Sequence, residues 1–80
     1  MVKPGIYQHY KNHKFYKVLA VAKHSETLED LVVYEAQYDN PVSKVWVRPL
    51  KMFLERVEYE GKMVPRFKYI GNNKISPLAS

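Results

Sequence analysis

The sequence lacks cysteine and is poor in glycine, with three glycines among its 80 residues. Without cysteine no disulfide can stabilise the fold, and no plausible ligand set for a structural zinc ion is left. Gly5, Gly61 and Gly71 are too far apart to form a glycine-rich phosphate-binding loop. A chain this short buries only about two-thirds of its unfolded surface. We therefore expect one small domain that folds by packing alone, with no cofactor, as a monomer or a weak homodimer.

Long apolar runs are also missing. The longest uncharged apolar run, Val18 to Ala22, is far shorter than the roughly 20 residues that a transmembrane helix needs. No apolar region follows the first residues as it would in a secretory signal. We expect no membrane partner and a cytoplasmic location, which the absence of cysteine permits.

Acidic residues are absent from both ends of the chain. All eight lie between Glu26 and Glu60, whereas residues 1–24 carry five lysines and residues 61–80 carry four bases, for a net charge of +5. If the two ends meet in the fold, the protein has one basic side that attracts anionic partners. Bases also interleave with aromatic rings near both ends. An alternative hypothesis is therefore the binding of single-stranded DNA or RNA through Lys11, Lys14, Lys17, Arg66 and Lys68.

The pattern of the remaining residues is typical of strands. Apolar and polar residues alternate, and turn-forming residues such as Asp39-Asn40-Pro41 separate the runs. In the second run, Tyr16, Val18, Ala20 and Ala22 form an apolar alternation that predicts one buried face. The predicted strands are residues 6–11, 15–23, 31–38, 44–48, 57–59 and 62–64.

Pro49 favours one short helical turn near residues 49–55, held against the sheet by Phe53. Five or six short antiparallel strands with such a turn predict a mainly β fold, a small SH3-like barrel, because closure protects the strand edges. We expect residues 1–70 to form this single domain and residues 71–80 to form a flexible tail. Closure would bring the first strand near the C-terminal hairpin.

Five short blocks of the sequence resemble a known family. In order they are Gly5-x-Tyr7-x-His9-Tyr10-Lys11, His24-Ser25-Glu26-Thr27, Val32-Val33-Tyr34, Trp46-Val47-Arg48-Pro49-x-x-Met52-Phe53 and Pro65-Arg66-Phe67. Over roughly residues 4 to 70 the chain resembles the bacterial family catalogued as domain of unknown function 1653. The resemblance implies a compact bacterial domain in the cytoplasm and implies no activity. The Asn12-His13 turn departs from the glycine-containing turn expected there.

Polar and aromatic residues gather at the predicted strand ends. We interpret them as the contact surface of a non-enzymatic binding module whose partner is a protein or a small anionic ligand. Aromatic rings would supply flat contact area, arginines would hold an anion or a carboxylate, and histidines would give hydrogen bonds. The predicted contact residues are Tyr7, His9, Tyr10, His24, Glu26, Tyr34, Trp46, Arg48 and Arg66.

Trp46 and Arg48 alternate with two valines and allow two interpretations. If Val45 and Val47 face the core, Trp46 and Arg48 project from the opposite face, where they could stack on a base, a sugar or a peptide side chain. In the other interpretation Trp46 lies under the C-terminal segment, and Arg48 pairs with an acidic residue: Glu26, Glu29 or Glu55.

A small hydrolase is a third and weaker hypothesis. His9 or His24 could act as a general base, with Ser25 as the nucleophile and Glu26 orienting the ring. Ser25 is, however, in a segment where serine more often caps a turn. His9 and His13 have a metal-ligand spacing only on a helix, so we predict no metal site.

Overall fold

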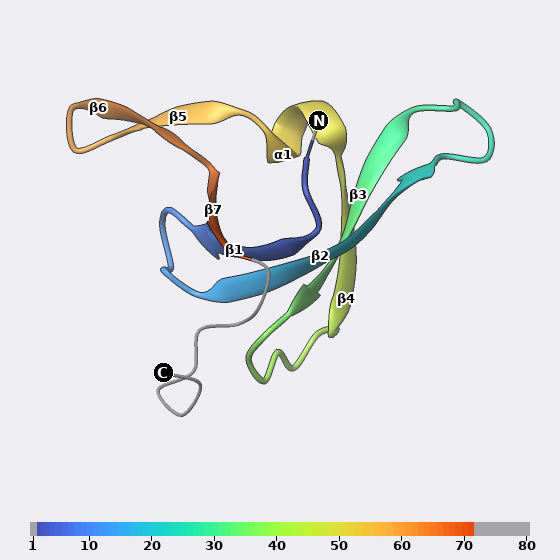
Figure 1. Ribbon diagram of the computed structural model, residues 1–80, viewed down its shortest axis with the longest axis horizontal. Helices are drawn as coiled ribbons and strands as arrows, with labels where there is room; N and C mark the ends of the chain where they lie inside the picture. Colours follow the sequence, from blue (N-terminus) through green and yellow to red (C-terminus); the bar gives the residue numbers. More distant parts are fainter. Residues whose placement is uncertain (1, 72–80) are drawn as a thin grey trace.

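The computed structural model describes residues 2–71, so the predicted flexible tail lies outside the described residues except for Gly71, which ends the last strand. The fold is mainly β, as predicted, with one short helix (Figure 1). In chain order the elements are β1 (Gly5–His9), β2 (Phe15–Lys23), β3 (Asp30–Ala36), β4 (Val45–Pro49), α1 (Leu50–Phe53), β5 (Arg56–Tyr59), β6 (Lys62–Pro65) and β7 (Phe67–Gly71).

Five strands form one antiparallel sheet in the order β4-β3-β2-β1-β7, while β5 and β6 form a separate hairpin that projects away from it (Figure 1). β4 and β7 are the two edges, so closure into a barrel is not confirmed. β7 is a strand that the sequence did not predict, and it pairs with β1, from His9↔Phe67 to Ile6↔Gly71. The two ends of the described chain therefore lie side by side in the sheet.

Backbone conformation fixes one tight turn and one close approach between two strands. Glu60 and Gly61 both have positive φ, 53° and 81°, as a two-residue hairpin turn between β5 and β6 requires. Gly5 has φ of 139°, and a Cβ there would lie 2.6 Å from the carbonyl oxygen of Gly71. Only glycine allows β1 and β7 to approach so closely at this position.

A β-bulge divides β2 into two halves with opposite faces. Tyr16 and Val18 are buried, but the register with β3 shifts between Val18 and Ala20, and Ala20 and Ala22 are exposed. The predicted buried alternation through Ala22 is therefore wrong beyond the bulge. One extra residue reverses which side of the sheet each later side chain faces.

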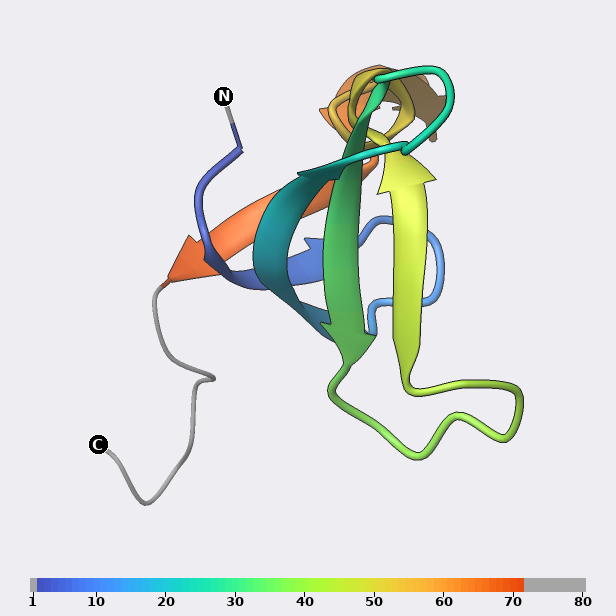
Figure 2. The same cartoon turned by 90° about the vertical axis from the view of Figure 1, so that its right-hand side faces the viewer.

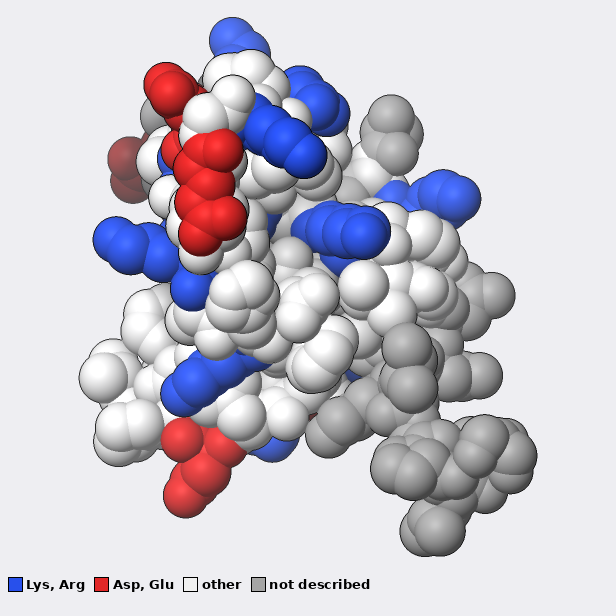
Figure 3. Space-filling view, turned by 90° about the vertical axis from the view of Figure 1, so that its left-hand side faces the viewer, with Lys and Arg blue, Asp and Glu red and all other residues white. Residues whose placement is uncertain are grey.

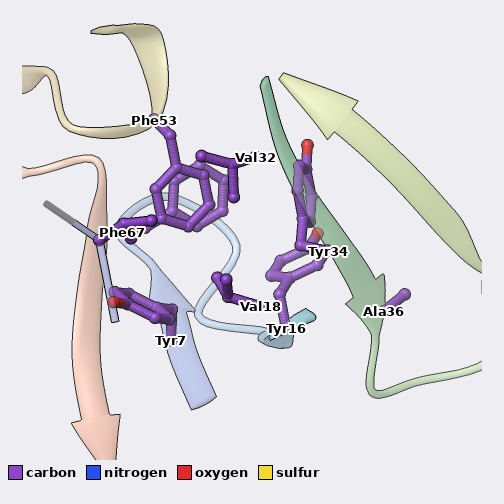
Figure 4. Packing of buried hydrophobic residues seen from close by; sticks show 9 residues of the cluster. Tyr7, Tyr16, Val18, Val32, Tyr34, Ala36, Phe53 and Phe67 are labelled. Atoms are coloured by element: carbon purple, nitrogen blue, oxygen red, sulfur yellow. The ribbon is translucent and has the colours of Figure 1, made fainter. Parts of the chain in front are cut away.

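The core is built mainly from aromatic rings on the inner face of the sheet, the face that α1 covers (Figure 4). Phe53 from α1 is 1% exposed and stacks on Phe67 of β7, with ring centroids 4.2 Å apart and planes 3° apart. Tyr7 meets the edge of Phe53 at 5.3 Å. Phe53 thus holds the helical turn against the sheet, as predicted. The buried apolar cluster comprises Val2, Tyr7, Tyr16, Val18, Val32, Tyr34, Ala36, Phe53 and Phe67.

We predict that Phe53→Ala lowers the free energy of unfolding by about 3–5 kcal/mol, because it removes a fully buried ring and leaves a cavity. Urea denaturation followed by tryptophan fluorescence measures the change. Met52→Ala, on the same helical turn but 45% exposed, should cost about 0.5 kcal/mol or less. Equal losses for the two variants would contradict the assignment of Phe53 to the centre of the core.

Candidate functional site: an aromatic pocket around Arg48

The two valines of β4 face outward, and its Trp46 and Arg48 face inward. Val45 is 47% exposed and Val47 is 57% exposed. Trp46 lies opposite Tyr34, and Arg48 lies opposite Val32, so both side chains are on the inner face. The interpretation in which the valines face the core is therefore wrong. The indole nitrogen of Trp46 donates to the carbonyl of Ser43 at 3.0 Å, which fixes the ring.

A hollow of about 230 Å³ opens beside these side chains. We call it the Arg48 pocket, lined by Tyr16, Tyr34, Asn40, Trp46 and Arg48. Its lining combines three aromatic rings with one guanidinium and one amide. Tyr34 and Tyr16 are 5% and 8% exposed, so their hydroxyl groups are held by a rigid core. β2, β3, β4 and the loop after β3 all contribute to it.

Arg48 faces no carboxylate among residues 2–71. Its Nε donates to the hydroxyl of Tyr34 at 3.4 Å, and its guanidinium carbon lies 5.6 Å from the centroid of the Phe67 ring. Glu55 instead pairs with Arg66 at 2.7 Å, so the predicted pairing of Arg48 with an acidic residue is not what the structure has. The charge of Arg48 is left uncompensated beside the pocket.

The hydroxyl of Tyr16, which lines the pocket, and that of Tyr38, which does not, share one hydrogen bond and leave one hydrogen over. Asn12 donates to Tyr16 at 3.3 Å, Asn40 donates to Tyr38 at 3.0 Å, and the two hydroxyl oxygens lie 2.8 Å apart. Each hydroxyl carries one hydrogen, and their shared bond uses only one of the two. The other hydrogen has no acceptor within the described part of the chain. Burial, and then the bond with Tyr38, raise the pKa of Tyr16 to about 12, so its hydroxyl stays protonated at neutral pH.

His9 contacts the same core rings but lines a separate hollow of about 340 Å³, together with Tyr10 and Tyr59. Its ring meets Phe67 edge-on at 4.9 Å and Tyr16 at 6.5 Å. Nδ1 accepts the backbone N–H of Lys11 at 3.1 Å, so the neutral ring carries its hydrogen on Nε2. Burial lowers the pKa of His9, and the positive charges of Arg48, Arg66 and Lys11 lower it further. His9 therefore stays neutral in a positively charged neighbourhood.

Three other predicted contact residues pack or pair with other parts of the protein and do not line the pocket. Tyr7 lies in the core, and its hydroxyl donates to the carbonyl of Lys3 at 2.8 Å. Tyr10 stacks on His9 and meets Tyr59 of the β5–β6 hairpin at 5.5 Å. Arg66 joins the start of β7 to Glu55, which follows α1. Of the nine predicted residues, the structure brings Tyr34, Trp46 and Arg48 together at the pocket, and His9 and Tyr10 at the separate hollow.

His24 and Glu26 lie elsewhere, in the loop between β2 and β3. Nδ1 of His24 accepts the backbone N–H groups of Glu26 at 3.1 Å and Thr27 at 3.3 Å. The ring therefore closes a turn, and the nitrogen that a general base would use is already occupied. Nowhere in residues 2–71 do three or more histidine or acidic side chains gather as a metal site would need.

Sequence reasoning missed several residues of this site: Tyr16, Tyr38, Asn12 and Asn40. Tyr16 was assigned to the core face, and it is indeed buried, but its hydroxyl reaches the pocket. Asn40 was interpreted only as part of a turn. A usable signal was available, since a tyrosine on a core-facing strand position must direct its hydroxyl to some polar partner.

The basic residues do not form one continuous surface on the side that carries the β5–β6 hairpin. Lysine and arginine side chains there are separated by uncharged surface, with acidic side chains among them (Figure 3). Lys17 lies opposite Glu35 on β3, and Lys14 lies over the ring of Tyr38 at 4.3 Å. Lys68 is exposed on β7, opposite Gln8.

We predict that His9 titrates below its ordinary pKa of 6.5, and that the protein becomes less stable as the pH falls below that value. Because the unfolded chain binds the proton more tightly, the contribution of His9 to the free energy of unfolding falls as the pH drops from 6.5 to the pKa of folded His9. It is constant above 6.5 and again below the folded pKa. NMR titration of the imidazole gives the midpoint, and urea denaturation at several pH values gives the stability. His9→Gln should remove this part of the pH dependence. A midpoint at or above 6.5 would contradict the burial and charge described here.

Among the described residues, no helix is both long and apolar enough to cross a membrane.

The family described as protein of unknown function (DUF1653) matches residues 5–69. The chain is also similar to the crystal structure of a protein of that family from Bordetella bronchiseptica, with 34% identity over 95% of this chain and 94% of the other and a TM-score of 0.85. A comparison with curated proteins found no match. The chain thus belongs to the family of domain of unknown function 1653.

Proposed function

We propose that this protein is a binding module that holds an anionic group of its ligand in the Arg48 pocket. The observation that carries the proposal is the guanidinium of Arg48, which borders a hollow and faces no carboxylate within residues 2–71. An arginine with free N–H groups beside aromatic rings is suited to carboxylates and phosphates.

The other polar groups of the pocket favour the same kind of ligand. The side-chain oxygen of Asn40 already accepts the backbone N–H of Val42 at 2.9 Å and that of Ser43 at 3.4 Å. The hydroxyl of Tyr34 accepts from Arg48, and the hydroxyl chain of Tyr16 and Tyr38 has a hydrogen to give. The groups left over are donors, so a ligand that only accepts hydrogen bonds fits better than one that must donate.

Charge points in the same direction. Arg48 and Lys14 are positive, and the lowered pKa of His9 and the raised pKa of Tyr16 favour the neutral form of each. An anion entering the pocket would be attracted by these cations and would meet no like charge among the lining residues. The flat faces of Trp46 and Tyr34 add contact area for a ligand with a planar part. We assign binding to this site and no reaction, and we place the module in the bacterial cytoplasm, as the family resemblance implied.

Nucleic-acid binding remains the alternative. Two of its five proposed residues already have partners, since Arg66 is paired with Glu55 and Lys14 lies over the ring of Tyr38. The same titration described next can test it with a mixed-sequence single-stranded oligonucleotide, whose binding should weaken steeply with salt.

We predict that Arg48→Gln weakens the binding of benzoate and of phenyl phosphate by about 10- to 100-fold, the loss of charge-assisted hydrogen bonds to an anion. An amide-correlation NMR titration measures the affinity. In the unaltered protein, the bound anion should also raise the pKa of His9 and leave the ring signals of His24, in the β2–β3 loop, unchanged.

Arg56→Gln is the matched control, because Arg56 lies on β5 and donates to the carbonyl of Met63, away from the pocket. It should bind both anions as the unaltered protein does. Equal weakening by the two variants, or shifts confined to Lys11, Lys17 and Lys68, would contradict the proposal and favour a diffuse charge effect.

A further inference from the structure

The sheet has an open edge next to the Arg48 pocket. β4 is the terminal strand and pairs only with β3 in the sheet order (Figure 2). The backbone N–H of Ala36 donates to the carbonyl of Lys44, so Ala36 and Lys44 are a hydrogen-bonded pair of the ladder between β3 and β4. In an antiparallel ladder such pairs alternate, so Trp46 and Arg48 also bond to β3. The N–H and C=O groups of Val45 and Val47 therefore point away from the sheet.

The side chains of β4 alternate between two surroundings along this edge. Trp46 and Arg48 border the pocket on the inner face, and Val45 and Val47 are exposed on the outer face. An extended segment paired with β4 would place every second side chain at the pocket and the others beside the valines. The carbonyl of Val45 already accepts from the hydroxyl of Ser43 at 2.9 Å, so a peptide N–H would share that oxygen.

We propose that β4 binds an extended acidic peptide by strand addition, with a carboxylate side chain of the peptide in the Arg48 pocket. This inference rests on the proposed function of the pocket and names the class of its ligand. The peptide main chain would bond to Val45 and Val47, and its acidic side chain would accept from Arg48. Side chains on its other face would be apolar, in contact with the two exposed valines.

Charge selects this occupant over a second copy of the chain. Residues 40–54 contain three bases, Lys44, Arg48 and Lys51, and no acid. Two copies joined through β4 would bring two positive segments together in any register, and like charges across a strand pair are destabilising. An acidic segment compensates these charges, and the exposed apolar edge that β4 otherwise presents becomes covered.

The probe is a blocked seven-residue peptide of alternating valine and glutamate, and the control peptide replaces glutamate with glutamine. Hydrogen exchange followed by NMR should show the amides of Val45 and Val47 protected when the glutamate peptide is present. The glutamine peptide should bind about tenfold more weakly or worse, since it lacks the charge that Arg48 attracts.

Val47→Pro tests the edge directly. It removes the outward N–H and leaves the ladder between β3 and β4 intact, because proline is tolerated at an edge where its nitrogen faces solvent. We expect peptide affinity to fall about tenfold, the loss of one main-chain hydrogen bond. Val47→Thr keeps the N–H but exchanges a methyl group of the contact surface for a hydroxyl, so its affinity should fall by less than that of Val47→Pro. A peptide N-methylated at the amides that face β4 makes the same test without changing the protein.

The outcomes separate this inference from the proposed function. Binding of benzoate without protection of Val45 and Val47 by the peptide would overturn the inference and leave the pocket proposal standing. Failure of both probes would overturn both. Protection of the same amides that rises with protein concentration, without peptide, would identify a second copy as the occupant. An oligonucleotide that competes with the peptide and shifts Trp46 would likewise overturn the choice of a peptide.

Discussion

The ring stack of Phe53 on Phe67 joins the two edges of an open sheet. α1 follows β4 directly, and Phe67 begins β7, so the stack spans the inner face between the strands that no hydrogen bond connects. Aromatic pairs of this kind contribute about 0.5–1.5 kcal/mol beyond the area they bury. In a small domain without cysteine, this contact takes the place of a closing strand pair. The five-stranded sheet can keep β4 unpaired at its outer side because its two ends are held through side chains.

The same ring organises the candidate site. Arg48 lies over Phe67, and His9 meets its edge, so two polar groups, one of them at the pocket, are positioned by a core residue. Arg48, Arg66 and the half-buried imidazole of His9 lie in one neighbourhood, where burial and then the charges of the two guanidinium groups lower the pKa of His9. A bound anion would oppose the effect of these charges. Stability and binding are therefore linked through one aromatic ring.

The sequence was informative about local structure and less so about how the strands meet. Alternation located most strands, and Pro49 with Phe53 predicted the helical turn, because these signals depend on neighbouring residues. The bulge in β2 has no such signal, since Leu19 is an ordinary strand residue, and it reversed the faces of Ala20 and Ala22. The sequence identifies Trp46 and Arg48 as site residues. Which face of the sheet they lie on depends on which face of β4 the rest of the chain covers, and that contact is not local. Asn40 and Tyr38 join the site only through distant contacts.

The pairing of β1 with β7 sets an order on the assembly of the chain. Ile6 meets Gly71, the two most distant partners in the sheet, so loop closure over nearly the whole domain precedes this contact. During synthesis, β2, β3 and β4 leave the ribosome one after another and can pair as neighbours. The ring of Phe53 has no stacking partner until Phe67 has been synthesised. The nascent domain thus exposes its core rings until the last strand emerges. Its completion is a late, non-local step, which in small β proteins is the slow one.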